Sequence, residues 1–413
     1  MLSMILSIWG NDLVDTKVAG GVLIVVGTSI GGAMLALPIA TAGSGFISSS
    51  IMLFVCWMIM TISAFFIMEV NLWLPHGNNM ISMARATLGK AGAVTAWVSY
   101  ILLMYALLAA YISGGSSVFG DLLGLIGIKI PQSLSSILFV AIFGFIVYRG
   151  IQLVDYSNRA LMTTKMAALF ILIFFTLPYL DPAKLVGGNP RLLLGSITVM
   201  MTSFGFATIV PSLRSYFEDD VRKLRLTILL GSLIPLICYI LWDFAILGAL
   251  PRDGENGLAT IMQRGGSTTD LTHSLSFYLH NHSINGFAHL FTAICVMTSF
   301  LCVSLGLSDF LADGLKIEKK GRGNLIVTAV TFLPSLIIVL FYPSIFVKAL
   351  SYAGIFCVIL VVLLPALMVW SGRYHKKFDT TRYQVMGGKL PVLVIILIGL
   401  AIIALGVKES LFS

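Results

Sequence analysis

Two clusters of small and hydroxylated residues interrupt apolar stretches of the chain, and the clusters share one pattern. The first reads Thr-Ser-Ile-Gly-Gly-Ala-Met-Leu-Ala-Leu-Pro over residues 28–38, and the second reads Thr-Ser-Phe-Gly-Phe-Ala-Thr-Ile-Val-Pro over residues 202–211. A membrane helix that unwinds at such a cluster exposes backbone amides and carbonyls, which lipid cannot satisfy, so the break must line a polar site. Paired breaks at corresponding positions of two halves are typical of a transporter's substrate site.

The backbone of a broken helix suits the two charges of an amino acid. Free amides at the start of a half-helix hold a carboxylate, and unwound carbonyls at the end of the other half hold an ammonium. In the first break we expect the amides of Gly31, Gly32 and Ala33 to take the first role. We expect the carbonyls of Gly27 and Thr28 to take the second. The alternative is that these glycines only permit close helix packing.

Aromatic residues near the breaks indicate the kind of side chain that the site accepts. Phe204 and Phe206 flank the second break and are placed to sandwich an aromatic ring. Tyr105 and Tyr111 lie six residues apart in the third predicted span, and we do not expect both to face the site. Tyr105 is nearer mid-membrane and is the one we predict there. Lipid or core packing is the alternative for each ring. The predicted substrate-binding residues are Gly27, Thr28, Ser29, Gly31, Gly32, Ala33, Tyr105, Thr202, Ser203, Phe204, Gly205 and Phe206.

Ionisable residues at membrane depth are costly and therefore indicate function. Glu69 is expected to pair structurally with a base in a loop, and Lys165 either has a role in transport or snorkels towards the membrane surface. Asp243 lies in an apolar stretch with no assigned role. Asp309 and Asp313, at the end of a predicted helix, oppose its dipole and should have cationic partners.

Composition places these residues in a membrane protein. Hydrophobic residues make up 58% of the 413-residue chain, charged residues 11%, and the mean hydropathy is +0.98, whereas a soluble domain has about 25% charged residues. The five cysteines lie in apolar stretches and are expected to be buried and unpaired. The apolar first ten residues lack a basic region and a cleavage site, so no signal peptide is predicted.

Other function classes lack their sequence signatures. The chain has no phosphate-binding loop, dinucleotide fingerprint or nucleophile elbow, so we predict neither an enzyme nor a cofactor. His280 and His282 have no third ligand at metal-site spacing, so no metal site is predicted. They lie in a long loop, 251–285, that we expect to contain short helices.

Apolar runs long enough to cross about 30 Å of hydrocarbon predict an all-α membrane protein. Eleven spans are expected, at 18–42, 46–72, 93–120, 133–150, 159–180, 192–216, 224–250, 286–314, 324–342, 344–371 and 390–408. With the N-terminus in the cytoplasm, 19 of the 26 Lys and Arg residues lie on the cytoplasmic side, so the positive-inside rule predicts N-in and C-out. The net charge of +8 then faces anionic lipid, and no nucleic-acid partner is needed.

The order of the spans makes spans 1–5 and 6–10 face opposite ways. We therefore predict a five-plus-five inverted repeat in which helices 1 and 6 are broken. Residues 18–180 form the first repeat, residues 192–371 the second, and residues 390–408 the additional helix 11.

Five motifs carry a resemblance to a known family. They are residues 27–38, Leu-Met-Tyr-Ala-Leu-Leu-Ala-Ala-Tyr-Ile-Ser-Gly at 103–114, residues 202–206, Val-Pro-Ser at 210–212, and Gly-Leu-Ser-Asp-Phe-Leu-Ala-Asp at 306–313. In this order they resemble the bacterial aromatic (hydroxy/aromatic) amino acid permeases, most of all the tyrosine-specific members. The resemblance covers nearly the whole chain and implies the LeuT-type fold of the amino acid-polyamine-organocation superfamily. Asp243 departs from the family, which more usually has glutamine there.

The resemblance also implies roles for single residues. A tyrosine of span 3 would touch the substrate carboxylate, and Lys165 would occupy the place of sodium in sodium-coupled relatives, near the Gly27 carbonyl and the span 8 hydroxyls of Thr298 and Ser299. Asp313 would act as an inner gate residue with Lys17, a solvated surface ion pair being the alternative.

The expected function is a secondary symporter in the cytoplasmic (inner) membrane. It would import an aromatic amino acid, L-tyrosine first, together with protons. Sodium coupling, or tryptophan or serine as the substrate, are the alternatives within this class. A channel or a non-transporting sensor are the alternatives outside it.

Overall fold

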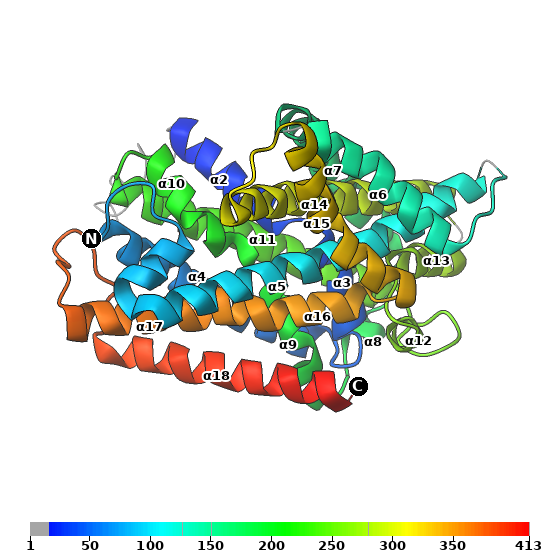
Figure 1. Cartoon of the computed structure of the whole chain (residues 1–413). Helices are drawn as coiled ribbons and strands as arrows, with labels where there is room; N and C mark the ends of the chain where they lie inside the picture. The colour runs from blue at the N-terminus through cyan, green and yellow to red at the C-terminus, as the bar shows by residue number, and fades with distance from the viewer. Residues whose placement is uncertain (1–15, 126, 150, 280, 413) are drawn as a thin grey trace.

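The computed structural model describes residues 16–412 except 126, 150 and 280, and this part of the chain contains helices and no strand. Ten of its helices or helix runs are long and apolar enough to cross a membrane, and α2 (Thr16–Ser29) with α3 (Gly32–Thr41) forms one further span, bent by 54°. The protein is therefore an all-α membrane protein with about eleven spans (Figure 1).

The spans lie close to the predicted ranges. After α2 and α3 come α4 (Phe46–Leu72), α5 (Met80–Leu125), α6 (Gln132–Arg149), α7 (Ile151–Thr176), α9 (Leu193–Ser203) leading to α10 (Val210–Tyr216), α11 (Val221–Ala249), α14 (His282–Leu315), α15 (Gly321–Phe341), α16 (Phe346–Cys357) leading through a π-helical segment to α17 (Leu364–Ser371), and α18 (Lys389–Phe412). Of these, α5 departs most from the prediction because a kink at Gly89, whose φ is 77°, joins a preceding segment to the span.

Short helices occupy the loops at one end of the bundle. They are α8 (Pro182–Leu185), α12 (Leu258–Gln263) and α13 (Thr268–Leu279). The predicted short helices of loop 251–285 are thus confirmed. His280 lies outside the described residues, as does the side chain of His282. We call this end, at the right of Figure 1, the α12 end.

The two interrupted spans pack on each other in the interior of the bundle. Among the helix contacts, α2 meets the 3-10 segment Gly205–Ile209 and α3 meets α9. The long helices α5, α16 and α18 run alongside one another across the molecule (Figure 1), and α18 reaches the α12 end with its last residues. The breaks are therefore held within a shell of continuous helices.

Glu69 pairs with a base, as predicted. Both of its carboxylate oxygens accept hydrogen bonds from the Arg373 guanidinium at 2.6 Å, and the Val385 amide donates to the same carboxylate. Both charged side chains are almost fully buried. This pair fixes the segment between α17 and α18. Of the cysteines, Cys302 departs from prediction because its residue is exposed, whereas the other four are buried.

Candidate functional site

The first break presents free backbone amides at the start of α3. Among the described residues, the amides of Gly31 and Ala33 have no hydrogen-bond acceptor, and the Gly32 amide donates to Ser299 Oγ at 2.8 Å. The positive end of the helix dipole adds to these donors, which makes a site suited to a carboxylate. The structure thus brings the three predicted amides together at one helix N-terminus.

The other half of the break supplies carbonyls. Gly27 and Thr28 lie in the last turn of α2, where carbonyls have no partner within the helix. The carbonyl that lies in the break itself is that of Ile30, which accepts a hydrogen bond from Lys165 Nζ at 2.5 Å. The Lys165 residue is 2% exposed, so this contact is shielded from solvent.

Lys165 and the two predicted hydroxyls of α14 do not form one cluster. Ser299 binds the Gly32 amide, as described above. The Thr298 hydroxyl donates to carbonyls of its own helix, Ile294 at 2.8 Å or Cys295 at 3.1 Å. Lys165 and Ser299 therefore hold the break at different points, and Thr298 contacts neither the break nor Lys165 among the hydrogen bonds of the described residues.

The second break is a tightening of the helix rather than a sharp bend. The α-helical geometry stops at Ser203, and a 3-10 segment over Gly205–Ile209 precedes α10. Residues 190–216 count as one span without a bend above 40°. Phe204 and Phe206 are both fully buried, and Thr202 donates to Thr198 O or Leu350 O. The expected unwinding at this position is thus limited to one 3-10 stretch.

Tyr239 of α11 joins the two breaks, and sequence reasoning missed it. Its hydroxyl lies 2.7 Å from Ser29 O and 2.7 Å from Ser203 O, and the side chain is fully buried. Its ring meets Phe204 edge-on at 5.1 Å. A tyrosine in the middle of an apolar span was the available signal, because a buried tyrosine hydroxyl needs a partner.

The tyrosine of α5 at the first break is Tyr111. Its ring lies against Gly32, where an added Cβ would be 2.7 Å from Cε1. Tyr105, the predicted residue, instead donates to Val330 O at 2.8 Å. Pro334 in α15 has no N–H to offer that carbonyl four residues earlier, so the Tyr105 hydroxyl satisfies it.

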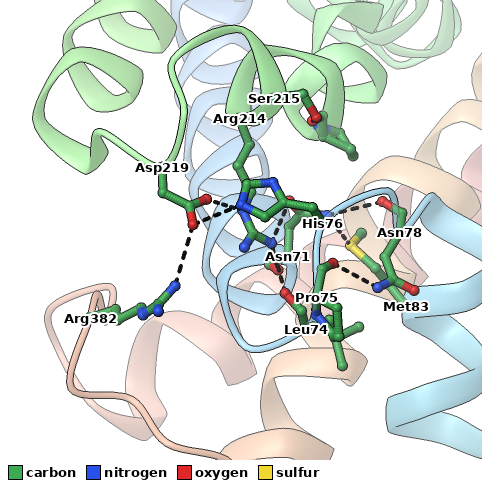
Figure 2. A network of polar contacts seen from close by, with 11 residues as sticks. Asn71, Leu74, Pro75, His76, Asn78, Met83, Arg214, Ser215, Asp219 and Arg382 are labelled. Carbon is green, nitrogen blue, oxygen red and sulfur yellow. Dashed lines mark hydrogen bonds and ion pairs between the residues drawn. The ribbon is translucent and has the colours of Figure 1, made fainter.

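A polar network around Arg214, which we call the Arg214 network, is drawn in Figure 2. It lies near α10, at the end of the bundle opposite to the α12 end in Figure 1. Arg214, 3% exposed, donates to Asp219 at 2.6 Å and to the carbonyls of Asn71 and Leu74. His76 lies 3.0 Å from Asp219. The hydrogen bond from Arg214, together with the charges of Arg214 and His76, holds the Asp219 pKa below its usual range. The network ties α10 to the loop between α4 and α5.

The predicted gate residues have separate surroundings. Lys17 Nζ lies 3.3 Å from Glu218 Oε1, and the described residues contain no ion pair of Asp313. Asp309 has the expected cationic partner, Lys319, at 2.5 Å. In this conformation the Lys17–Asp313 pair is therefore not formed. The described residues also contain no cluster of three side chains able to hold a metal ion.

Comparisons with known proteins give one family model and several relatives that cover nearly the whole chain. A family model described as the tryptophan/tyrosine permease family matches residues 14–406. The tyrosine-specific transport system 1 of Haemophilus influenzae is 33% identical over 393 residues, covering 94% of this chain and 95% of that relative. The tryptophan-specific transport protein of the same species is 32% identical, with 92% and 93% covered. The low affinity tryptophan permease of Escherichia coli is 28% identical, with 93% of each chain covered.

Proposed function

Because this chain belongs to the tryptophan/tyrosine permease family, whose members transport aromatic amino acids, we propose that it imports L-tyrosine together with protons. It does so by alternating access across the cytoplasmic membrane, with its N-terminus in the cytoplasm and its C-terminus outside. Residues 18–180 and 192–371 act as two inverted repeats, with residues 390–408 as an extra helix. The named relatives are transport proteins or permeases, not enzymes.

The substrate lies between the two breaks. The free amides of Gly31 and Ala33 hold its carboxylate, and the carbonyls of Gly27 and Thr28 hold its ammonium. The aromatic side chain lies near Phe204 and Phe206, whose rings favour edge-on or offset packing with another ring. The free amides at the start of α3 support this placement, since such amides in a low-dielectric interior need an acceptor.

Lys165 couples transport to protons. The observation that carries this assignment is its 2.5 Å hydrogen bond to Ile30 O, which joins α7 to the break in the first span. A buried ammonium is expensive unless it is paired, so its proton is retained while the carbonyl is in place. Loss of the proton removes the donor charge and releases the inner half of the first span, α2, towards the cytoplasm.

Uptake into proteoliposomes tests this proposal. Labelled tyrosine is offered under a proton gradient alone and under a sodium gradient alone. We expect accumulation with the inward proton gradient and none attributable to sodium. Lys165→Ala should lose gradient-driven accumulation while retaining exchange of bound substrate. Lys184→Ala is the matched control, because Lys184 also donates to a backbone carbonyl, that of Ala249, outside the breaks.

The same assay decides between the alternatives. Accumulation driven by sodium, or full proton-driven accumulation by Lys165→Ala, contradicts the coupling. Competition by unlabelled tyrosine, tryptophan and serine ranks the substrates, and stronger competition by tryptophan would contradict tyrosine as the preferred one. In the conformation described here, the Arg214 network and the Lys17–Glu218 pair are proposed to close the cytoplasmic side. In another conformation, Asp313 is proposed to pair with Lys17.

A further inference from the structure

Asp243 is a carboxyl group buried in the α12-end half of α11, one turn beyond Tyr239. It is fully buried, and its Oδ1 has no hydrogen-bond partner. Its Oδ2 lies 3.2 Å from the hydroxyl of Thr41, in the last turn of α3. The end of α11 at Ala249 lies about 9 Å further along the helix. The carboxyl group therefore faces α3, the half of the first span that lies towards the α12 end.

The Thr41 hydroxyl has one hydrogen and two neighbours that can accept it. It lies 2.8 Å from Leu37 O, the shorter of its two contacts, and 3.2 Å from Asp243 Oδ2. If it donates to Leu37 O, the contact with Asp243 is a hydrogen bond only when the acid carries the hydrogen. A protonated carboxyl group donates to Thr41 and satisfies both contacts at once.

Among the side chains that the structure describes, no cation pairs with Asp243 to compensate a negative charge. In the helices packed against α11, several charged side chains that the structure describes have other partners. Lys165 of α7 donates to Ile30 O, Lys184 of α8 to Ala249 O, Glu69 of α4 pairs with Arg373, Lys17 of α2 with Glu218, and Arg214 of α10 with Asp219. Thr41 is the polar side chain that contacts Asp243 among the described residues. An unpaired carboxylate in such a site binds a proton instead of remaining charged.

We propose that Asp243 and Thr41 form a proton-binding site that closes the α12 end of the first span. The protonated acid holds α3 against α11. When α3 moves away, water reaches the carboxyl group, which then releases its proton to that side. The inference rests on the proposed function in one respect, that the first span moves during transport.

The structure provides room for this movement. A cavity of about 600 Å³ borders the last turn of α3 at Ile39 and Ala40 and the residues that follow α3, Ala42 and Gly43. It separates that end of α3 from parts of α9, α12 and α16. The contact between Thr41 and Asp243 is therefore one of the restraints on a helix end that is not packed on all sides.

Infrared spectroscopy tests the proton directly. The spectrum of the purified wild type minus that of Asp243→Asn should contain the carbonyl band of a protonated carboxylic acid at pH 7. Asp253→Asn, which removes an exposed loop carboxylate, is the matched control. The spectrum of this variant should keep the protonated-acid band, so the wild type minus Asp253→Asn spectrum should lack it. A difference spectrum without the protonated-acid band overturns the proposal.

Thiol labelling tests the closure. Ala36 is fully buried in α3, and Ala36→Cys in a Cys302→Ser background reports opening to an impermeant maleimide. Because maleimide reacts with the thiolate, each rate is divided by that of an exposed cysteine at the same pH. The normalised labelling should rise with external pH, by up to about tenfold per unit for a single titrating group. Asp243→Asn, which stays neutral, should be labelled slowly at every pH. Thr41→Val should be labelled faster than the parent at acid pH.

Labelling of Asp243→Asn with the parent's pH dependence would overturn the proposal. So would unchanged labelling of Thr41→Val, which keeps the shape of the side chain and tests the hydrogen bond. Both experiments are made without substrate. If the wild type failed to take up tyrosine, the proposed function would be contradicted. The infrared and labelling results would still decide whether Asp243 and Thr41 bind a proton.

Discussion

Gly31 shows how little space the first break allows for a side chain. Its backbone is extended, with φ −149° and ψ −157°, which any residue can adopt. The constraint is steric, because an added Cβ would lie 2.4 Å from Ser299 Oγ, the atom that holds the Gly32 amide. A side chain at this position must displace the Ser299 hydroxyl and leave a buried amide without its acceptor.

Gly31→Val should therefore abolish tyrosine uptake. Losing the hydrogen bond to a buried amide costs about 1–3 kcal/mol, a factor of about 5 to 150 in binding. The valine side chain also crowds the site of the substrate carboxylate, so the two effects together remove uptake. Equilibrium binding of labelled tyrosine measures the effect. Gly286→Val is the control, since nothing lies within 4 Å of its added Cβ. Normal uptake by Gly31→Val would place the substrate elsewhere.

The helix α13 is fastened to α5 by a contact that depends on pH. His273 Nε2 lies 3.1 Å from Asp121 Oδ2. The centres of the His273 and His289 rings are 6.1 Å apart, and the two ring planes meet at 86°. The hydrogen bond to Asp121, with the charges of Asp121 and Asp270, raises the pKa of His273. A group with a raised pKa adds stability that is complete below its unfolded value, about 6.5, and is lost as pH rises through the folded value.

Thermal unfolding in detergent between about pH 5.5 and 8.5 measures this contribution. We expect the unfolding temperature of the wild type to exceed that of His273→Gln most at the acid end of this range. The difference in unfolding temperature should shrink as pH rises above about 6.5. His375→Gln, in an exposed position near α17, should keep the wild-type profile. A difference that grows with pH would mean that His273 is not held by its charge.

At the scale of the whole molecule, the proposed crossing of the membrane by eleven spans predicts that α2 begins and α18 ends on opposite sides. The loop before α18 and the loop that contains α12 lie at opposite ends of the bundle (Figure 1). Met386, 88% exposed, belongs to the first loop, and the exposed Glu255 to the second. The positive-inside rule assigns the first loop to the cytoplasm.

Cysteine labelling in oriented vesicles tests this topology. In a Cys302→Ser background, Met386→Cys should react with an impermeant maleimide only in inside-out vesicles. Glu255→Cys should react only in right-side-out vesicles. The background protein itself should remain unlabelled because its other cysteines are buried. The reverse pattern would invert the proposed orientation.

The positions of the spans and of the first break follow from the amino-acid sequence alone. Apolar run length decides where a helix can cross lipid, and glycine and proline act on the backbone within a few residues, so both are local signals. For the same reason the amides at Gly31, Gly32 and Ala33 and the buried Lys165 were identifiable without the fold. The cost of burying a charge in the membrane predicted that Glu69 has a cationic partner, but it did not predict which residue that partner is.

The partner of each polar group was decided by the tertiary structure. Tyr111 and not Tyr105 faces the break. The two tyrosines lie on different faces of α5, and the Tyr105 hydroxyl donates to the Val330 carbonyl, which Pro334 leaves without its helical donor. Tyr239 bridges two carbonyls that are distant in sequence, and Lys17 meets Glu218 and not Asp313. Hydrogen bonds form over about 3 Å, and only the packing of whole helices brings such groups within that distance.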